Sequence, residues 1–305
     1  MKEKVEALLK LWGIESEVKQ IYQTAWAVGE GFVLKTGENF KALIRNITIM
    51  KVLSECGVPV ASPIPTIDGK DYVEEEGRYY VVMNKLQGTH IVDIYEKDYA
   101  GIAYETGKVI ARLHKAFLAC EEKVTFGDNS LLDEMKGWIT ESLKRNHFTY
   151  ISELDFRKSL EELEWCYPKL PKQLIHRDIH YGNLLFYENE FSGYIDFDLS
   201  QKNIRLFDLC YFLMGILGGH EKNEEDVGIW LHIVTSLIEG YEAMVQLTAL
   251  EKESICCVMK SIELLFVAYF FNQSNEALAK SATSMHDFVR DHEKEINAAI
   301  LKATE

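Results

Sequence analysis

The spacing of apolar residues changes once along this chain, near residues 84–88, and this change limits the folds that the chain can adopt. Before it, apolar and polar residues alternate in several short segments, as they do in strands with one buried face. After it, apolar residues recur every three or four positions over long stretches, as they do in amphipathic helices. We therefore expect an α+β protein with two lobes, a small antiparallel β-sheet lobe at residues 1–86 and a large helical lobe at residues 87–305.

The first lobe is expected to contain a small sheet and two helices. The segments SEVKQIY and GFVLKT are predicted to form two antiparallel strands, joined by a turn that contains Gly29 and Gly31. The segments DYVEEE and YYVVMN are predicted to form further strands. An amphipathic helix opens the chain, and a second helix is predicted from Phe40 to Cys56, because the apolar residues there share one helical face and a glycine follows.

The second lobe is expected to be helical with one interruption. Helices are predicted at about 94–120, 130–165, 206–218, 225–246, 249–275 and 276–301. The strand-like interruption at 173–197 contains the stretch LIHRDIHYGNLLF, in which polar residues stand between two apolar runs. Two short strands, Leu184–Tyr187 and Phe191–Phe197, joined by the turn ENE, would bring the chain back beside this polar stretch.

The composition is that of a globular protein with an acidic surface. The chain has 305 residues, of which 47% are hydrophobic, and this is enough apolar surface for a sizeable core. Its 33 basic and 48 acidic residues give a net charge of −15, which argues against non-specific nucleic-acid binding. The charge suits a cationic small-molecule partner, and it equally suits an acidic protein that needs only to stay in solution.

Cysteine usage and the apolar segments bear on the compartment. The six cysteines are scattered, without the paired spacing of a zinc site or a disulfide framework, and are expected to be reduced core thiols. The N-terminal helix has no cleavage site of a leader peptide, and no run reaches the about 18 uninterrupted apolar residues of a membrane helix. We expect a cytoplasmic protein that binds neither membranes nor nucleic acid, and we leave its oligomeric state open.

The polar stretch carries a set of residues suited to phosphoryl transfer. Asp178 and Asn183 lie five residues apart, and Asp196 follows thirteen residues later at the end of a predicted strand. Phosphoryl transfer requires a carboxylate that orients the attacking hydroxyl and accepts its proton, together with amide and carboxylate oxygens that hold Mg²⁺ on the nucleotide phosphates. The alternative is that these are ordinary turn residues, as Asp and Asn often are.

A phosphate site also needs a cation and a place for the base of the nucleotide. Lys35 lies at the end of the second predicted strand, where a phosphate-binding lysine belongs. The last predicted strand of the sheet, YYVVMN, ends at the lobe boundary. There the backbone groups of Asn84 and Leu86 are expected to be free to pair with adenine.

Several segments, in order along the chain, resemble the aminoglycoside phosphotransferase and choline kinase superfamily: FVLK, YYVVMNKLQG, GKVIARLH, LIHRDIHYGNLLF and GYIDFDLSQKNIRLFDLCYF. The resemblance extends from about residue 20 to about residue 220. It implies a protein-kinase-like fold and a small-molecule kinase that uses ATP, or alternatively GTP, with Mg²⁺. By this resemblance Asp178 looks like the catalytic base, and Asn183 and Asp196 look like the Mg²⁺ ligands.

Further residues take roles from the same resemblance, and two positions depart from it. Lys35 looks like the phosphate-binding lysine, and His176 and Asp208 look like architectural residues that pin the catalytic loop. Where a helix glutamate usually pairs with the lysine, this chain has Asn46, so Lys35 is expected to lack its ion pair until nucleotide binds. Asp198 stands where a small residue often follows, and it is expected either to approach a second metal or the substrate, or to cap the next turn.

These observations predict an ATP-dependent phosphotransferase that acts on a hydroxyl of a small molecule, an aminoglycoside-like or other amino alcohol. Alternative acceptors are choline, ethanolamine, homoserine or a sugar, because a fold does not fix its acceptor. The missing helix glutamate leaves open a catalytically weak nucleotide-binding module. A protein kinase is disfavoured, because only eleven residues separate Asp196 from Asp208, too few for a long activation segment.

Two further patterns have both a functional and a structural interpretation. His176 and His180 have the i, i+4 spacing of zinc ligands, but the stretch lacks the glutamate of a helical HExxH motif and a glycine follows. Aromatic residues of the late helices could surround a cation, although at helical spacing such residues more often form core. These aromatic residues are Trp230, Tyr241, Tyr269, Phe270 and Phe271.

Overall fold

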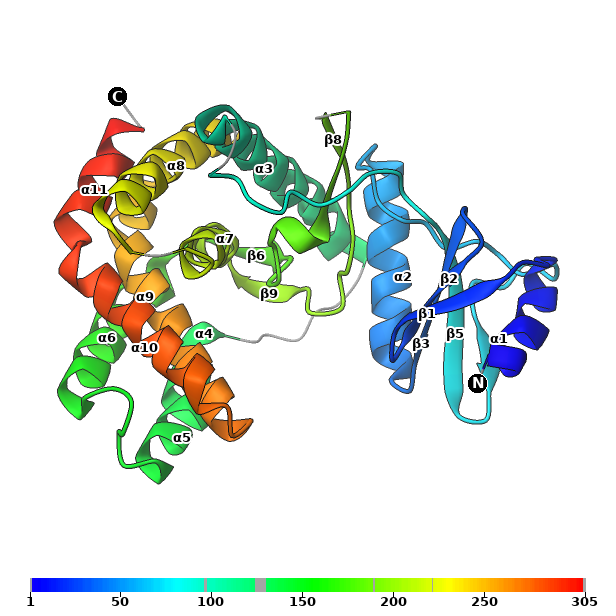
Figure 1. Cartoon of the computed structure of the whole chain (residues 1–305), viewed down its shortest axis with the longest axis horizontal. Coiled ribbons are helices and arrows are strands. Elements are labelled where there is room, and N and C mark those ends of the chain that lie inside the picture. The colour runs from blue at the N-terminus through cyan, green and yellow to red at the C-terminus, as the bar shows by residue number, and fades with distance from the viewer. Residues whose placement is uncertain (1, 96–97, 124–129, 189, 221, 304–305) are drawn as a thin grey trace. The chain divides into compact units, whose positions relative to one another are not determined.

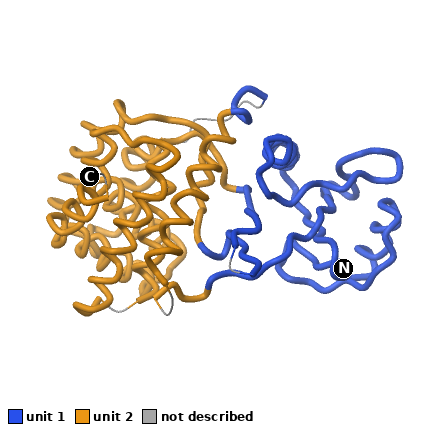
Figure 2. The backbone as a smooth tube through the Cα atoms, turned by 90° about the horizontal axis from the view of Figure 1, so that it is seen from above, with its two compact units in different colours: residues 1–91, 119–125, 181–198 blue, residues 92–118, 126–180, 199–305 orange. Residues whose placement is uncertain are grey.

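The computed structural model describes residues 2–95, 98–123, 130–188, 190–220 and 222–303. The chain forms two compact units, coloured separately in Figure 2. We call residues 1–91, 119–125 and 181–198 the sheet unit, and residues 92–118, 126–180 and 199–305 the helical unit. Each unit is assembled from separate segments of the chain, whereas the sequence prediction has one boundary, after residue 86, and that boundary stays a prediction.

The sheet unit is built on an antiparallel sheet of five strands in the order β1-β2-β3-β5-β4 (Figure 1). The strands are β1 (Val18–Tyr22), β2 (Ala25–Val28), β3 (Phe32–Gly37), β4 (Val73–Glu75) and β5 (Arg78–Asn84). The predicted direct pairing of the first two strands is wrong, because β2 lies between β1 and β3 and pairs with both. Three of the four residues of β2 are buried, so its sequence, AWAV, has no alternation of apolar and polar residues that would reveal a strand.

One face of the sheet packs against the start of the chain. Helix α1 (Lys2–Leu9) and the 3₁₀ turn η1 (Lys10–Trp12) cover it, and the indole of Trp12 donates a hydrogen bond to the Ile64 carbonyl at 2.8 Å. The shared core consists of Val5, Leu8, Leu9, Trp12, Val18, Trp26, Val28, Leu34, Tyr80 and Val82. Because successive side chains of a strand alternate between faces, Lys35, which follows Leu34, points to the opposite face.

Helix α2 (Phe40–Glu55) forms where the sequence predicts a helix. The side chain of Asn39 caps it by accepting a hydrogen bond from the Ala42 amide at 3.1 Å. Its buried residues are Ile47, Ile49, Met50, Val52 and Leu53, which form one stripe of the helix. The helix therefore packs through this stripe and keeps its polar side chains at the edges of the contact.

The hairpin of β7 (Leu184–Tyr187) and β8 (Glu190–Tyr194) also belongs to the sheet unit. A 3₁₀ turn, η4 (Tyr181–Asn183), leads into it. The hairpin is fastened by backbone hydrogen bonds, since the Phe186 amide donates to Thr89 and the Tyr194 amide donates to Pro59, each at 2.9 Å. The predicted hairpin thus forms, with β8 shorter than expected, and Asn189 of the predicted turn ENE lies outside the described residues.

The helical unit contains most of the helices that follow the five-stranded sheet along the chain (Figure 1). They are α3 (Tyr99–Lys123), α4 (Leu131–Glu134), the π-helical turn η2 (Met135–Ile139), α5 (Thr140–Arg145), α6 (Glu153–Cys166), the 3₁₀ turn η3 (Tyr167–Lys169), α7 (Leu206–Gly218), α8 (Glu224–Glu242), α9 (Ala249–Asn272), α10 (Glu276–Asp291) and α11 (Glu293–Lys302). The last turn of α3, from Ala119, belongs to the sheet unit.

Helix positions follow the predicted periodicity, but two predicted helices are divided. The stretch predicted at 130–165 comprises α4, η2, α5 and α6, and the stretch at 276–301 comprises α10 and α11 with a break at His292. A second small sheet begins in the interruption and ends beyond it, because β6 (Lys172–Ile175) pairs antiparallel with β9 (Gln201–Ile204). The sequence prediction missed β9, because QKNI is mostly polar and its pairing partner lies far away along the chain.

Helix α9 forms the centre of the helical unit. Its most apolar 18-residue part has a mean hydropathy of 1.8, enough by length and composition alone to cross a membrane. However, 72% of that part is buried inside the protein, as expected for the core helix of a globular unit. All six cysteines are free thiols, and five of them are buried, while Cys56 is exposed.

Helices α3 and α8 approach each other closely at two glycines. A methyl group on Gly107 would overlap the carbonyl oxygen of Leu237, and one on Gly240 would overlap the carbonyl oxygen of Tyr104. The contact is reciprocal, since each glycine faces the backbone of the other helix. Only a residue without a side chain lets two helix backbones lie this close.

We expect Gly107→Ala and Gly240→Ala each to lower the free energy of unfolding by about 1–3 kcal/mol, because the added methyl group forces the two backbones apart. Urea denaturation of each variant measures this. The matched control is Gly228→Ala on α8, where an added methyl group meets nothing within 4 Å. The control should be as stable as the parent or gain up to about 1 kcal/mol from helix propensity, and equal losses in all three variants would contradict the argument.

Candidate active site

The residues predicted to carry the chemistry gather in two clusters, one in each unit. The sheet unit brings together Lys35, Asn46, Asn183, Asp196 and Asp198, and the helical unit brings together His176, Asp178 and Asp208. Neither cluster depends on a single element, since each draws on segments that are distant in sequence.

Lys35, on β3, is held by two carboxylates. Its ammonium donates a hydrogen bond to Asp196 Oδ1 at 3.0 Å and lies 3.6 Å from Asp198 Oδ2. Burial opposes the charge of the lysine, but the carboxylates of Asp198 and Asp196 outweigh burial and raise the pKa of Lys35 above its ordinary value. The expectation that Lys35 lacks an ion pair in the absence of nucleotide is therefore wrong.

Asn46, at the position of the missing helix glutamate, holds one of the two carboxylates that pair with the lysine. Its Nδ2 donates to Asp198 Oδ1 at 2.6 Å, and the guanidinium of the neighbouring Arg45 donates to the Asp198 carbonyl at 3.2 Å. Burial raises the pKa of Asp198, Lys35 opposes this, and Asp196 adds to it. Helix α2 thus holds a carboxylate beside Lys35 without supplying one itself.

Asn183 and Asp196 are brought side by side by the ends of the β7–β8 hairpin. The Ile195 amide donates to the Asn183 carbonyl at 3.0 Å, one residue before Asp196. Asp196 has a φ of 65°, in the left-handed region that a residue other than glycine seldom adopts. Amide and carboxylate oxygens are the donors that Mg²⁺ prefers, so this pair fits a magnesium site.

In the helical unit, the loop after β6 is fixed by Asp208. This residue lies in the first turn of α7, and none of its surface is exposed. Its carboxylate accepts hydrogen bonds from the His176 and Arg177 amides at 2.8 Å each, and His114 Nε2 lies 3.0 Å from it. The other ring nitrogen of His114 lies 2.9 Å from the Tyr241 hydroxyl, so His114 is a buried partner of Asp208.

Asp178 presents its carboxylate from this fixed loop. Tyr211, three residues after Asp208 on α7, donates a hydrogen bond to Asp178 Oδ1 at 2.6 Å. Burial, followed by this hydrogen bond, raises the pKa of Tyr211, so its hydroxyl stays protonated and remains a donor. The Asp178 amide in turn donates to His176 Nδ1 at 3.4 Å, which turns the buried imidazole toward the loop.

The neighbouring Arg177 is occupied by a structural ion pair. Its guanidinium donates to both carboxylate oxygens of Glu134 at 2.7 and 2.8 Å, and both side chains are mostly buried. Its φ of 68° is also left-handed. Among the described residues, no group of three His, Cys, Asp or Glu side chains is arranged to hold a metal ion, so the zinc interpretation of HRDIH has no third ligand.

The predicted adenine contacts need one correction. The Asn84 amide is not free, because it donates to the Ser62 carbonyl at 3.1 Å, and the Asn84 side chain accepts from the Ser62 amide at 2.5 Å. The following residue, Lys85, donates its amide to Gly31 at 2.8 Å. Leu86 is the next position along this segment, and its contact with adenine stays a prediction.

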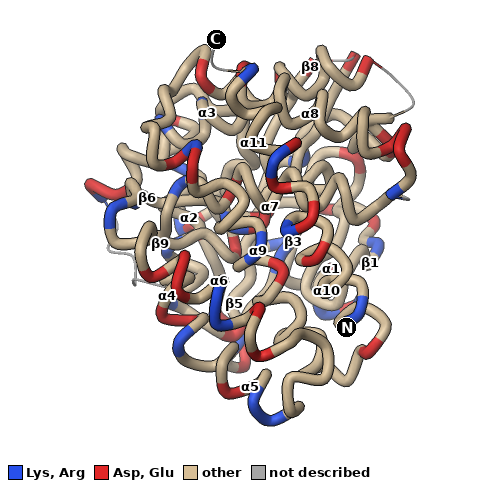
Figure 3. The backbone as a smooth tube through the Cα atoms, turned by 90° about the vertical axis from the view of Figure 1, so that its left-hand side faces the viewer, with Lys and Arg blue, Asp and Glu red and all other residues tan. Residues whose placement is uncertain are grey.

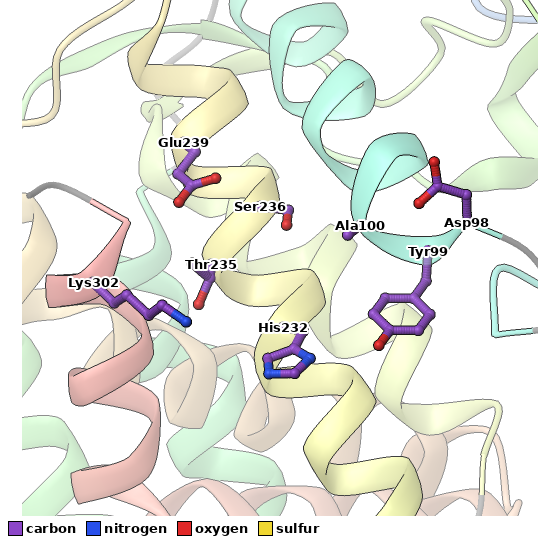
Figure 4. Close-up of a pocket in the computed structure, with 8 residues that line it drawn as sticks. All are labelled: Asp98, Tyr99, Ala100, His232, Thr235, Ser236, Glu239 and Lys302. Atoms are coloured by element: carbon purple, nitrogen blue, oxygen red, sulfur yellow. The ribbon is translucent and has the colours of Figure 1, made fainter.

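A surface pocket of about 500 Å³ lies on the helical unit (Figure 4). It is lined by Asp98, Tyr99, Ala100, His232, Thr235, Ser236, Glu239 and Lys302. Asp98 caps α3 by accepting a hydrogen bond from the Gly101 amide at 3.1 Å. None of the residues predicted to carry the chemistry lines this pocket, and Asp98, one of its acidic residues, already serves as the cap of α3.

Three residues complete the clusters. The sequence prediction missed two of them, Tyr211 and Glu134, and it included Asp198 only as a contact of a second metal or the substrate or as a turn cap. Tyr211 orients Asp178, Glu134 holds Arg177, and Asp198 takes the place of a helix glutamate at Lys35. Tyr211 could have been found, because a residue three positions after Asp208 on a helix lies on the same helical face. Glu134 carries no comparable signal, since its partner is 43 residues away.

The order of these parts along the chain is that of phosphotransferases with the protein-kinase-like fold, in which a strand lysine precedes an aspartate loop and a metal-binding pair. The sequence pattern of the phosphotransferase enzyme family matches residues 20–241. A homoserine kinase of Rhizobium meliloti (strain 1021) is 27% identical over 225 residues, which cover 72% of this chain and 64% of that protein. The match therefore spans less than two thirds of the length of this curated relative.

Solved structures share the fold over nearly the whole chain. The amicoumacin kinase hAmiN in complex with AMP-PNP, Ca²⁺ and Ami has a TM-score of 0.69 and 18% identity, covering 94% of this chain and 96% of that one. The microcompartment-associated aminopropanol kinase has a TM-score of 0.65 and 15% identity, covering 97% and 98%. At these identities the likeness concerns the fold alone.

The family pattern covers well over half of the chain, and this chain belongs to the phosphotransferase enzyme family. The resemblance stated from the motifs is confirmed, as is the α+β, protein-kinase-like fold.

We expect Asp208→Asn to lower the free energy of unfolding by about 3 kcal/mol, because the amide Nδ2 would face an N–H donor of the loop and leave it unsatisfied. Urea denaturation measures the loss. Asp291→Asn, which changes an exposed carboxylate paired with Arg290, is the control and should change stability little. If both variants had the same stability, Asp208 would not be the residue that fixes the loop.

Proposed function

We propose that this protein is an ATP-dependent phosphotransferase that transfers the γ-phosphoryl group to a hydroxyl of a small amino alcohol. The observation that carries the proposal is the placement of Asp178, whose carboxylate projects from a loop fixed by buried Asp208 and is oriented by Tyr211. Family membership and the homoserine kinase relative support the same class of reaction.

Asp178 would act on the acceptor. Its carboxylate accepts the proton of the acceptor hydroxyl while the hydroxyl oxygen forms a bond to the γ-phosphorus and the bond from phosphorus to the leaving ADP oxygen breaks. The hydrogen bond from Tyr211 to Asp178 Oδ1 would orient the carboxylate for this step. Because the covalent demands of this step are small, positioning and electrostatics supply most of the rate.

The sheet unit would bind the nucleotide phosphates. Asn183 and Asp196 would hold Mg²⁺, which when bound screens the charge of the phosphates. Lys35 would bind phosphate oxygens, and Asp198 would keep its ammonium in place when Asp196 turns to the metal. We therefore prefer this role for Asp198 to the contact with a second metal or the substrate that the sequence suggested.

Asp178 and Asn183, five residues apart along the chain, belong to different clusters, and we propose that both clusters serve this reaction. We propose ATP as the nucleotide, with GTP as the alternative and Leu86 as the adenine contact.

The acceptor is proposed to be an amino alcohol, aminoglycoside-like or smaller, with choline, ethanolamine, homoserine and sugars as the alternatives. Two similar proteins bear the names of kinases for such compounds, homoserine and aminopropanol. The net charge of −15 also suits a cationic partner. A cytoplasmic location without nucleic-acid or membrane partners remains a prediction.

The proposed activity is tested by Mg²⁺-dependent ADP release from ATP with a panel of aminoglycosides, aminopropanol, choline, ethanolamine, homoserine and sugars. We expect acceptor-dependent turnover that falls by at least about 10³-fold in Asp178→Asn, while ATP binding is retained, because only the proton acceptor is lost. Asp155→Asn, in the first turn of α6, is the control and should keep full activity. ATP binding without turnover for any acceptor would instead indicate a nucleotide-binding module.

The pairing of Asn46 with Asp198 is tested by exchanging their side chains. Asn46→Asp places two carboxylates face to face, and Asp198→Asn removes a carboxylate from Lys35, so each should weaken ATP binding about five- to tenfold. The double variant restores one amide and one carboxylate at the same contact and should recover most of the affinity. Calorimetric titration with ATP, with and without Mg²⁺, measures the coupling, and strictly additive losses would show that the two residues act independently.

A further inference from the structure

The acidic residues of the chain are widely spread. Figure 3 shows Asp and Glu on many elements, interspersed with Lys and Arg. Charge distributed in this way attracts cations in general but selects none of them. Selecting a cationic acceptor requires an individual carboxylate held in a defined place, and helix α9 carries a carboxylate of this kind.

Helix α9 has three buried charged residues, and two of them are paired. Glu251 accepts a hydrogen bond from Arg205 at 2.6 Å, and Lys260 donates one to Glu162 at 2.7 Å. Glu263 is 5% exposed, yet among the described residues it makes no hydrogen bond and no ion pair. Buried charges in proteins are normally paired, so Glu263 is the exception on its own helix.

The surroundings of Glu263 disfavour its ionised form. Burial raises the pKa of Glu263 to about 8, and Lys222 opposes the rise only in part. The Lys222 ammonium donates to the Ser284 hydroxyl at 3.2 Å, so its charge is directed to another helix. A buried carboxylate without an ion-pair partner is stabilised in its ionised form when a cation binds beside it.

Glu263 shares a helix face with aromatic rings that lead to Asp178. Phe266 and Phe270 follow at i+3 and i+7, are half-buried, and stack with ring centroids 5.6 Å apart. The Phe266 ring lies 5.9 Å from the ring of Tyr211, which donates to Asp178. Burial and the charge of Asp178 raise the pKa of Tyr211, and the charge of Glu263 adds to this, which places Glu263 within electrostatic reach of Tyr211.

We propose that Glu263 binds a primary ammonium group of the acceptor, with the faces of Phe266 and Phe270 beside the cation. The inference rests on the proposed phosphotransferase function and adds the residue that selects amino alcohols over neutral alcohols. An ion pair formed here supplies the partner that Glu263 lacks, and aromatic faces favour an ammonium ion over a neutral group. The hydroxyl of the same acceptor is the one presented to Asp178.

The test compares 3-aminopropan-1-ol with propane-1,3-diol, in which a hydroxyl replaces the ammonium group. In Glu263→Gln we expect the KM for the amine to rise at least about tenfold, with the KM for ATP and the turnover of the diol unchanged, because only the ionic contact is lost. Glu263→Asp keeps the charge and should lie between the parent and Glu263→Gln. Glu253→Gln, on the exposed side of the same helix, is the control and should behave as the parent.

Two measurements separate this inference from the proposed function. If neither compound is phosphorylated, the phosphotransferase proposal fails for these two compounds. The binding role of Glu263 is then tested by the Tm alone: adding the amine should raise the Tm of the parent and should not raise the Tm of Glu263→Gln. Urea denaturation should show Glu263→Gln to be at least as stable as the parent, since no partner is lost. Equal weakening of both compounds, or a less stable Glu263→Gln, would overturn the role of Glu263 in binding ammonium.

Discussion

The buried carboxylate of Asp208 is the constraint on which the helical unit depends. A carboxylate removed from water is costly unless its lone pairs are satisfied. The amides of His176 and Arg177 and the imidazole of His114 satisfy them, and the Tyr241 hydroxyl engages the other nitrogen of that imidazole. One side chain therefore joins the start of α7 to α3 and to the loop after β6, and any other conformation of the loop would leave the carboxylate unsatisfied. Because α7 is fixed in this way, its next turn can orient the proposed base.

The conformation held by these contacts is locally strained. A residue other than glycine in the left-handed region costs about 1–2 kcal/mol, and Arg177 and Asp196 both adopt it. Five other non-glycine residues among those described have a positive φ, and all five lie in turns, where this conformation is common. Arg177 and Asp196 lie outside turns, one beside the proposed base and the other at the proposed metal ligand. The strain is thus concentrated where the proposed chemistry requires fixed side chains, and the surrounding hydrogen bonds maintain it.

The sequence predicted those helices and strands whose local pattern of apolar residues matches the burial that the folded protein gives them. Helix α7 was predicted at 206–218, its observed bounds, because its apolar residues follow the helical period. Strands β2 and β9 were missed, because the first is apolar throughout and the second is polar, so neither alternates. The order of the motifs identified the candidate site, but not its completing contacts. Asn46 and Asp198 are 152 residues apart, and Tyr211 and Asp178 are 33 apart, and tertiary structure alone brings such pairs together.

The contact between Asn46 and Asp198 shows how a fold can keep a carboxylate beside the lysine while placing that carboxylate on a different segment of the chain. A glutamate on α2 would make the lysine depend directly on the position of that helix. Here both carboxylates that hold Lys35 lie on the segment after β8, two residues apart, and α2 contributes a neutral amide that fixes one of them. The ion pair of Lys35 is therefore tied to the segment that carries the proposed metal ligand Asp196. A small rotation of α2 would lengthen the hydrogen bonds from Asn46 and Arg45 to Asp198 without breaking an ion pair. A lysine placed in advance of nucleotide binding needs little reorganisation when phosphate arrives.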